Sequence, residues 1–300
     1  MLHRSSAAML VIIVLGAVAP EAAPAAEQKP LEAASPARTV VLDTTGFWRL
    51  HHALKPPVVQ LPDGPTPILI NGWLDRETPL PPADWHAVAF DDSTWLRGPA
   101  RLNCRSPYVA RLCMRGWFQV TDPATVRDLR LSLVYHGGVI VRLNGREVAR
   151  QHLAAGHLAG DALAKAYPSE AFLDPGGGLL YDWDFYKRKP TPEHARRLAL
   201  RDRGLQSVAI PADALRKGVN VLAVEIVRAP YDKAVDEHKT AKPGRRGCVY
   251  ELAFNTCEVL RVQLSAASPQ GVSQEAVRPA GLQLWNSDPV SYTHLRAHET

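Results

Sequence analysis

The sequence predicts an all-β protein, an antiparallel β-sandwich with a long, partly helical insert. Three segments carry this prediction. In residues 129–135, three leucines and Tyr135 alternate with Arg130, Ser132 and Val134, which is the period of a half-buried strand. Asn144-Gly145 joins two β-prone runs, and this dipeptide suits the type I′ turn of a hairpin because both residues tolerate positive φ. Residues 219–228 are apolar on both faces, as expected of a central strand that is covered on both sides.

The final segment, residues 290–300, reads VSYTHLRAHET. Reverse translation of these letters gives the transposon-end adapter of sequencing libraries, and a chance match over so many consecutive codons is negligible. We therefore expect an adapter translation here and give His294, His298 and Glu299 no weight as metal ligands. The natural protein is expected to continue beyond Pro289.

The first 25 residues have the pattern of a secretory signal peptide. An apolar run at 7–18 is too short to span a bilayer, and Ala23-Pro24-Ala25 offers the small residues that a signal peptidase reads. We expect an exported protein, periplasmic, on the cell surface or extracellular, with no membrane span after cleavage. The alternative is an uncleaved membrane anchor.

The remaining chain divides by composition. Residues 26–38 are rich in Pro, Ala and Glu and are expected to be disordered. The sandwich domain is expected at 39–263, with its core at 84–259 and an insert at 151–204. Residues 264–289 are rich in Ser, Ala, Gln and Pro, which predicts a linker to a downstream region that the sequence does not contain.

The charge distribution argues against nucleic acid as a partner. The formal net charge is +5, and the basic residues are scattered along the chain. The one tight basic run, 187–189, is short, and a solvated loop accounts for it. We expect no nucleic-acid partner for an exported protein without a basic face.

Four cysteines, Cys104, Cys113, Cys248 and Cys257, are disulfide candidates because export makes bridges plausible. None has the C-x-x-C spacing of a zinc site. The last pair bounds what reads as one strand of about 30 Å, whereas a bridge needs Cα atoms within roughly 7 Å. Three outcomes stay open: a bridge from the first pair to the second, a Cys104–Cys113 bridge across a turn at Ser106-Pro107, and free buried thiols.

The β pattern stops within the insert. It contains three glycines at 176–178 and an aromatic run at 181–186. Thr191-Pro192-Glu193 has the cap and first-turn signature of a helix that runs to about Leu200. A loop of this length is usually functional or disordered, and its aromatic content argues against disorder.

Four motifs occur in an order typical of one known fold. They are F-D-D-S-x-W at 90–95, R-x-x-F-x-V at 115–120, V-x-L-N-G-x-E-V at 141–148 and I-P-x-x-x-L-R-x-G-x-N-V-L-A-V-E at 210–225. Together they resemble the galactose-binding-like jelly roll, close to the sugar-binding domain at the front of family 2 glycoside hydrolases. The resemblance implies a sandwich that packs beside a catalytic barrel or stands alone as a sugar-binding or adhesive module. It also implies that the catalytic carboxylates lie in a later domain.

Sugar recognition pairs exposed aromatic rings with planar polar groups. The insert offers both in one loop, whose candidate ligand-binding residues are Trp183, Tyr186, Tyr181, Asp182 and Asp184. The alternative is that Trp183 and Phe185 pack the insert onto the sandwich.

No catalytic residue is expected within this chain, because no G-x-S-x-G, H-E-x-x-H or phosphate-binding loop occurs. No cofactor is expected beyond a structural calcium, for which Asp91, Asp92 and Glu251 are the oxygen donors. Turn capping is the alternative role of Asp91 and Asp92. The histidines lack ligand spacing, and ordinary surface or hairpin positions account for them; these are His51, His52, His136, His152 and His157.

Three functions are compatible with these patterns. The first is a non-catalytic carbohydrate-binding module of a secreted bacterial protein. The second is the front domain of a truncated exported glycoside hydrolase, the enzyme class we expect if the full-length protein is an enzyme. The third is a structural or adhesive sandwich without a small ligand. The natural sequence beyond residue 289 separates the first two, and glycan binding separates the third.

Overall fold

The computed structural model describes residues 38–68, 77–101, 107–180, 191–237 and 254–273. The predicted signal peptide and the adapter-like tail lie outside this part of the chain. No helix in these stretches is long and apolar enough to cross a membrane.

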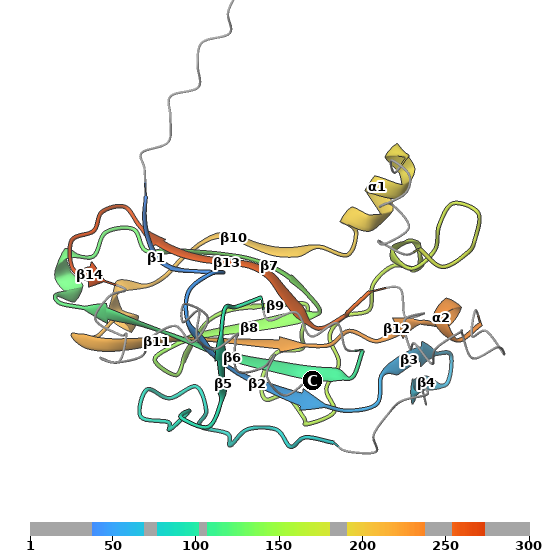
Figure 1. Cartoon of the computed structure of the whole chain (residues 1–300), viewed down its shortest axis with the longest axis horizontal. Helices are drawn as coiled ribbons and strands as arrows, with labels where there is room; N and C mark the ends of the chain where they lie inside the picture. Colours follow the sequence, from blue (N-terminus) through green and yellow to red (C-terminus); the bar gives the residue numbers. More distant parts are fainter. Residues whose placement is uncertain (1–37, 69–76, 102–106, 181–190, 238–253, 274–300) are drawn as a thin grey trace, which may run out of the picture. The chain divides into compact units, whose positions relative to one another are not determined.

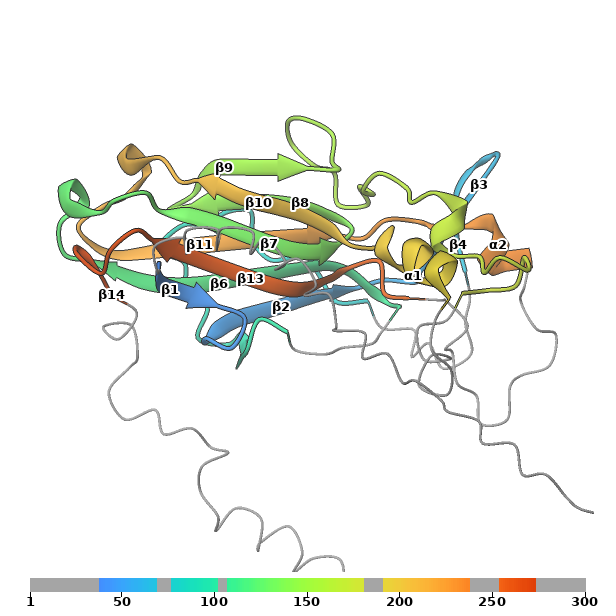
Figure 2. The ribbon, with the colours of Figure 1, turned by 90° about the horizontal axis from the view of Figure 1, so that it is seen from above.

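Two antiparallel sheets form the body of the protein, which confirms the predicted all-β sandwich. The smaller sheet has the order β1-β13-β7-β10, and its strands are β1 (Thr39–Asp43), β13 (Glu258–Ala266), β7 (Arg130–His136) and β10 (Arg203–Ala209). Figure 1 shows β10, β7 and β13 as a layer over the second sheet, and Figure 2 shows the strands of this layer side by side.

The larger sheet has the order β5-β2-β6-β11-β8-β9, and β14 also pairs with β6. Its strands are β5 (Leu96–Gly98), β2 (Trp48–Leu54), β6 (Val109–Val120), β11 (Gly218–Val227), β8 (Gly138–Leu143), β9 (Arg146–Gln151) and β14 (Val272–Ser273). A third, small sheet has the order β12-β3-β4, with β12 (Tyr231–Asp232), β3 (Val58–Leu61) and β4 (Gly64–Pro67).

Helices are short in the described stretches. The α-helices are α1 (Pro192–Ala199) and α2 (Lys233–Glu237), and single 3-10 turns occur at 123–125, 169–171 and 212–214. Helix α1 begins where the sequence predicted: the Thr191 hydroxyl accepts from the backbone N–H of His194 at 3.3 Å, and Pro192 occupies the first turn.

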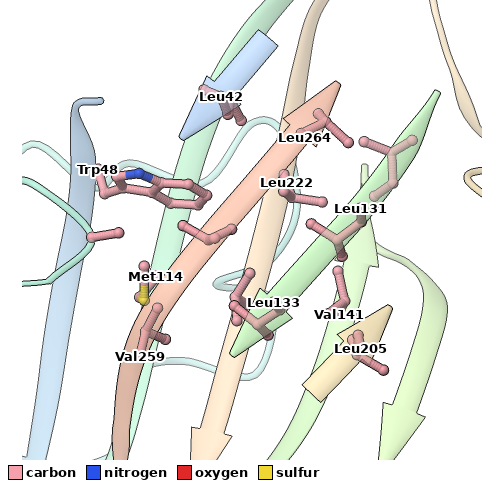
Figure 3. Packing of buried hydrophobic residues seen from close by; sticks show 14 of the residues in the cluster. Leu42, Trp48, Met114, Leu131, Leu133, Val141, Leu205, Leu222, Val259 and Leu264 are labelled. Carbon is pink, nitrogen blue, oxygen red and sulfur yellow. The ribbon is translucent and has the colours of Figure 1, made fainter. Parts of the chain in front are cut away.

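The main core lies between the two large sheets and follows from strand alternation. In β7, Leu131, Leu133 and Tyr135 are buried, while the intervening residues are half-buried. These side chains meet residues of the other sheet, including Trp48, Met114 and Leu222 (Figure 3). The predicted half-buried strand is therefore confirmed.

Strand β11 is the central strand that the sequence predicted. It lies between β6 and β8, and every residue from Asn220 to Val227 is buried. Leu222, Val224 and Ile226 face the main core, whereas Ala223 packs on the opposite face with Trp85 and Trp95. Both faces are covered, which is why the strand carries apolar residues on both.

The predicted hairpin joins β8 to β9. Asn144 and Gly145 have φ of 53° and 90°, as a type I′ turn requires. The Asn144 side chain has a second role, because its amide nitrogen donates to the carbonyl of Ala214 at 2.9 Å and to Asn220 Oδ1 at 2.8 Å. The turn is thus tied to the neighbouring loop that precedes β11.

Two predicted boundaries are wrong. The linker that was expected from Leu264 begins too early, because β13 continues to Ala266 and β14 adds Val272–Ser273 to β6. Leu264 and Ala266 face the main core, and the polar residue Ser265 lies between them. At the other end, Arg38 belongs to the fold, since its guanidinium donates to Asp128 Oδ2 at 2.7 Å and to the Ser265 hydroxyl at 3.0 Å.

Candidate functional site

A second apolar core lies outside the sandwich and organises a separate region. We call this region the end lobe and define it as residues 58–68, 152–180, 191–202, 229–237 and 254–255. Figure 1 shows β3, β4, β12 and α2 gathered together beyond the end of β11. The buried residues of the core come from several of these segments; they are Val59, Ile68, Ala164, Tyr167, Ala171, Phe172, Leu179, Ala229, Tyr231 and Val235.

Aromatic rings fill the centre of the end lobe. The Phe254 ring lies 5.1 Å from the Phe172 ring and 5.3 Å from the Tyr167 ring, and the Phe172 ring lies 6.2 Å from the Tyr231 ring. The Tyr231 hydroxyl donates to the Phe254 carbonyl at 3.0 Å. Burial raises the pKa of Tyr231 and raises that of Tyr167 to about 12, so both hydroxyls stay neutral. These contacts fix the positions of the rings, which serve to pack the core of the end lobe.

Arg201 holds the insert onto this aromatic core. Its buried guanidinium donates to the carbonyl of Ala171 at 2.9 Å and to that of Leu180, and it lies 4.5 Å above the Phe254 ring. Arg197 of α1 donates to the Leu173 carbonyl at 2.8 Å. The described residues on either side of 181–190 are therefore both anchored to the end lobe.

The predicted ligand-binding residues lie within that loop, outside the described residues. These predicted residues are Trp183, Tyr186, Tyr181, Asp182 and Asp184. Their ligand-binding roles stay a prediction.

A hollow of about 280 Å³ opens on the end lobe between β3, β12 and the insert. Its lining residues are Gln60, Leu61, Pro62, Ala166, Tyr167, Pro230, Tyr231, Asp232 and Lys233. Sequence reasoning missed this hollow, because its residues come from three segments that share no local pattern. Its volume lies just below the usual range of pockets for drug-sized ligands, so it suits a single small ring.

The Asp232 carboxylate is the fixed polar group of the hollow. Its Oδ2 accepts from the Ser169 hydroxyl at 2.7 Å, and its Oδ1 accepts from the backbone N–H of Ala234 at 2.9 Å. Each carboxylate oxygen has a further lone pair available to a ligand hydroxyl. Gln60 supplies an exposed side-chain amide. Lys233 supplies an ammonium group, whose Nζ lies 3.5 Å from Glu237 Oε1. The hollow thus combines hydrogen-bonding groups with an apolar wall of Leu61, Pro62 and Pro230.

The F-D-D-S-x-W motif has a structural role on the outer face of the larger sheet. Arg115 of β6 is fully buried and donates to Asp92 Oδ2 at 2.6 Å and to the Ala87 carbonyl at 2.7 Å. Trp85, Phe90 and Trp95 pack beside this pair. The segment at 84–95 is therefore fastened to the sheet by a buried ion pair surrounded by aromatic rings.

Asp92 gives the predicted calcium site no support, because Arg115 occupies the position that a bound cation would take. Asp91 instead caps a turn, accepting from the Ser93 backbone N–H at 2.9 Å, and this hydrogen bond lowers the pKa of Asp91. Glu251 lies outside the described residues. In the parts of the chain that the structure describes, no three His, Cys, Asp or Glu side chains gather as metal ligands.

Cys113 and Cys257 are both free, buried thiols. Cys113 packs with Trp85 and Trp95 on the outer face of the larger sheet, whereas Cys257 belongs to the main core. Burial raises the pKa of Cys113 well above its usual range and raises that of Cys257 to about 12. The other two candidates, Cys104 and Cys248, lie outside the described residues.

His136 was expected to be an ordinary surface or hairpin residue, and that expectation is wrong. It is 6% exposed, and both ring nitrogens face carboxylates: Nδ1 lies 2.9 Å from Glu258 Oε1, and Nε2 lies 3.2 Å from Asp202 Oδ1. The partners are remote in sequence, so no spacing rule could find them.

No protein-family profile matches the chain, and no curated protein matches it. Among solved structures, it is similar to a family 2 glycosyl hydrolase from Bacteroides cellulosilyticus, with 11% identity, a TM-score of 0.30 and coverage of 75% of this chain and 20% of that chain. The chain is also similar to the β-glucuronidase of Ruminococcus gnavus, with 10% identity, a TM-score of 0.33 and coverage of 79% of this chain and 30% of that chain. A third similar structure is the β-glucuronidase of Bifidobacterium dentium complexed with coumarin-3-O-glucuronide. It has 14% identity, a TM-score of 0.31 and coverage of 75% of this chain and 30% of that chain.

The chain thus spans 20% to 30% of the length of these three proteins. The family that the sequence motifs resemble reappears among the solved structures. With TM-scores this low, the assignment of the sandwich rests on the strand pairing and the core described above.

Proposed function

We propose that the chain is a non-catalytic carbohydrate-binding module of an exported bacterial protein and that a sugar binds at the end lobe. The observation that carries this proposal is the hollow of about 280 Å³ with the Asp232 carboxylate held in its wall. Small-ligand sites combine an apolar wall with a few fixed polar groups, and this hollow has both.

A sugar ring matches this wall chemically. Its hydroxyls need acceptors and donors, which Asp232, Gln60 and Lys233 supply, and its apolar ring face needs an aliphatic or aromatic surface. Asp232 is already oriented by Ser169 and by the Ala234 N–H. Binding therefore costs little side-chain entropy at this residue.

A binding role fits the hollow better than hydrolysis. Glycoside hydrolysis needs two carboxyl groups on opposite sides of the scissile bond. Asp232 is the one carboxylate among the lining residues of this hollow. Trp183 and Tyr186, predicted ligand-binding residues that lie outside the described stretches, are proposed to add ring contacts to a bound sugar.

A glycan array followed by affinity electrophoresis in glycan-containing gels tests the proposal on the whole chain. We expect at least one glycan to retard the protein. Asp232→Ala and Gln60→Ala should reduce that retardation and raise the apparent Kd at least tenfold, because each removes a hydrogen bond of roughly 1.5 kcal/mol. Trp183→Ala and Tyr186→Ala test the loop in the same gels.

Matched controls are available on the sandwich. Gln263→Ala removes an exposed strand glutamine from β13, and Asp213→Ala removes an exposed aspartate that pairs with Arg146. Both should leave retardation unchanged. If no glycan retards the chain, or if the control variants lose as much affinity as Asp232→Ala, sugar binding at the end lobe is refuted. Complete lack of retardation would favour a structural or adhesive sandwich.

The second candidate is the front domain of a longer exported glycoside hydrolase. The observation in its favour is that all four sequence motifs meet in one sheet: F-D-D-S-x-W packs on it, and the other three supply β6, the β8–β9 hairpin and β11. The complete gene tests this candidate. A barrel with paired catalytic acids encoded downstream would support it, and a stop or an unrelated module would exclude it.

A further inference from the structure

His136 lies where the sandwich meets the end lobe. It is the last residue of β7, and its ring is enclosed by acceptors: Glu258 Oε1 and the Asn255 carbonyl each lie 2.9 Å from Nδ1, and Asp202 Oδ1 lies 3.2 Å from Nε2. A neutral imidazole carries one N–H and can satisfy one side only, whereas an imidazolium donates from both nitrogens. The geometry therefore favours the charged ring.

Asp202, at the end of the insert, and the Asn255 carbonyl join His136 to the end lobe, whereas Glu258 is its cross-strand partner in the smaller sheet. Asp202 follows α1, and Glu258 begins β13 shortly after Phe254. The Phe254 ring packs edge-on against the His136 ring at 5.3 Å and also contacts Phe172. His136 thus ties the end of β7 to Asp202 after α1 and to the chain at 254–255.

The charged groups near His136 explain why its pKa is raised. Asp202 and Glu258 face it directly, while the two nearby guanidiniums point to other partners: Arg201 lies over the Phe254 ring and Arg203 over the Tyr167 ring. Burial lowers the pKa of His136, but hydrogen bonds and charge from the two carboxylates raise it more. The net shift is above the ordinary value of 6.5.

We propose that His136, Asp202 and Glu258 form a proton-dependent clamp that keeps the end lobe packed on the sandwich and loosens it when the imidazolium loses its proton. The folded pKa is raised, so the clamp contributes fully below about pH 6.5 and is lost as the pH rises through the folded value. An effect of the clamp on sugar affinity rests on the proposed function; the clamp itself does not.

Native-state amide hydrogen exchange of the whole chain tests the clamp. Exchange is compared at about pH 6 and about pH 9 after correction for the intrinsic rate, with β11 as the internal reference for global unfolding. We expect the end-lobe amides at 164–173 and 229–237 to lose protection relative to β11 by at least tenfold at the higher pH. Equal protection at both values would overturn the proposal.

Variants separate the clamp from a general effect of pH. His136→Gln should abolish the pH-dependent step, and Asp202→Asn, at a half-exposed position, should move the step to lower pH. Asp213→Asn, which removes an exposed carboxylate paired with Arg146 outside the lobe, should leave the profile of the wild type. The same pH step in all three variants would contradict the clamp.

An NMR titration of the His136 ring protons in the wild-type chain gives a second readout, which does not depend on how well the variants fold. A midpoint above 6.5 supports the clamp, and a midpoint at or below 6.5 refutes it. Neither result changes if no glycan retards the protein, so failure of the clamp and failure of the proposed function are distinguishable.

Discussion

The ion pair between Arg115 and Asp92 is the sharpest test of how the covering segment is held on the sheet. The Arg115 side chain is fully buried and the Asp92 side chain is 3% exposed, with Nε and Oδ2 2.6 Å apart. Asp92→Asn preserves the shape of the side chain and removes its charge. Arg115 then keeps its carbonyl partners but loses its close counter-charge. Arg49, the other side chain near Asp92, is also cationic and cannot replace that charge.

Removing one partner of a buried ion pair usually costs about 3–5 kcal/mol of folding free energy. We place Asp92→Asn near the lower end, at about 3 kcal/mol, because the amide oxygen still accepts one hydrogen bond. For a domain of this size, 1 kcal/mol corresponds to about 2–4 °C in Tm. The expected loss in Tm is therefore about 6–12 °C.

Thermal unfolding followed by near-ultraviolet circular dichroism measures this loss, because Trp85 and Trp95 pack beside the pair. Asp91→Asn is the matched control: it changes the adjacent carboxylate of the same motif, which is exposed and only caps a turn, so Tm should hardly change. A chelator such as EDTA should not lower Tm at this site. If Asp92→Asn melts within 2 °C of the wild type, the ion-pair account is wrong. If Asp91→Asn or EDTA lowers Tm as much as Asp92→Asn does, the calcium hypothesis gains support.

Three further predictions concern the core and the turns. Cys113 and Cys257 should resist iodoacetamide at pH 8 in the native chain and react only after unfolding, because burial raises the pKa of both thiols and hides them; fast native labelling would contradict their placement. Gly116→Ala should cost about 1–3 kcal/mol in urea unfolding, since its Cβ would lie 2.7 Å from the buried Trp48 ring, and an unchanged midpoint would show that the ring can move. Gly145→Val should cost at least about 1 kcal/mol in the same assay because its φ is 90°, and a neutral result would exclude the type I′ turn.

Local patterns predicted the elements that local forces decide. The alternation in β7, the Asn144-Gly145 turn and the cap of α1 at Thr191 each depend on residues a few positions apart, and each is present. The end of β13 was misplaced for the same reason. Its last residues read as a Ser- and Ala-rich linker, and only pairing with β1 and β7 makes them a strand.

The candidate site could not be read from the sequence, because it is assembled from distant segments. The hollow joins residues near 60, 166 and 232, and no spacing rule relates them. The acceptors of His136 lie at Asp202 and Glu258, far along the chain. Asp92 was weighed as a metal ligand because a carboxylate in a turn has the same local pattern whether its partner is a cation or an arginine.

The buried arginines explain how a sandwich can hold so much irregular chain. Loops have carbonyl groups that no strand partner satisfies, and each buried carbonyl needs a donor. Arg115 supplies donors to the segment at 84–95, Arg201 to the insert, and Arg228 to the Pro56 carbonyl before β3.

A guanidinium suits this task because it offers several fixed N–H donors and packs over aromatic rings, as Arg201 does over Phe254. Part of the positive charge of the sequence is therefore directed inward, where it ties loops to the sheets. This use of arginine fits a basic protein whose cations are scattered in sequence, and Arg201 and Arg228 fasten irregular chain at and next to the end lobe, where a ligand site needs fixed walls.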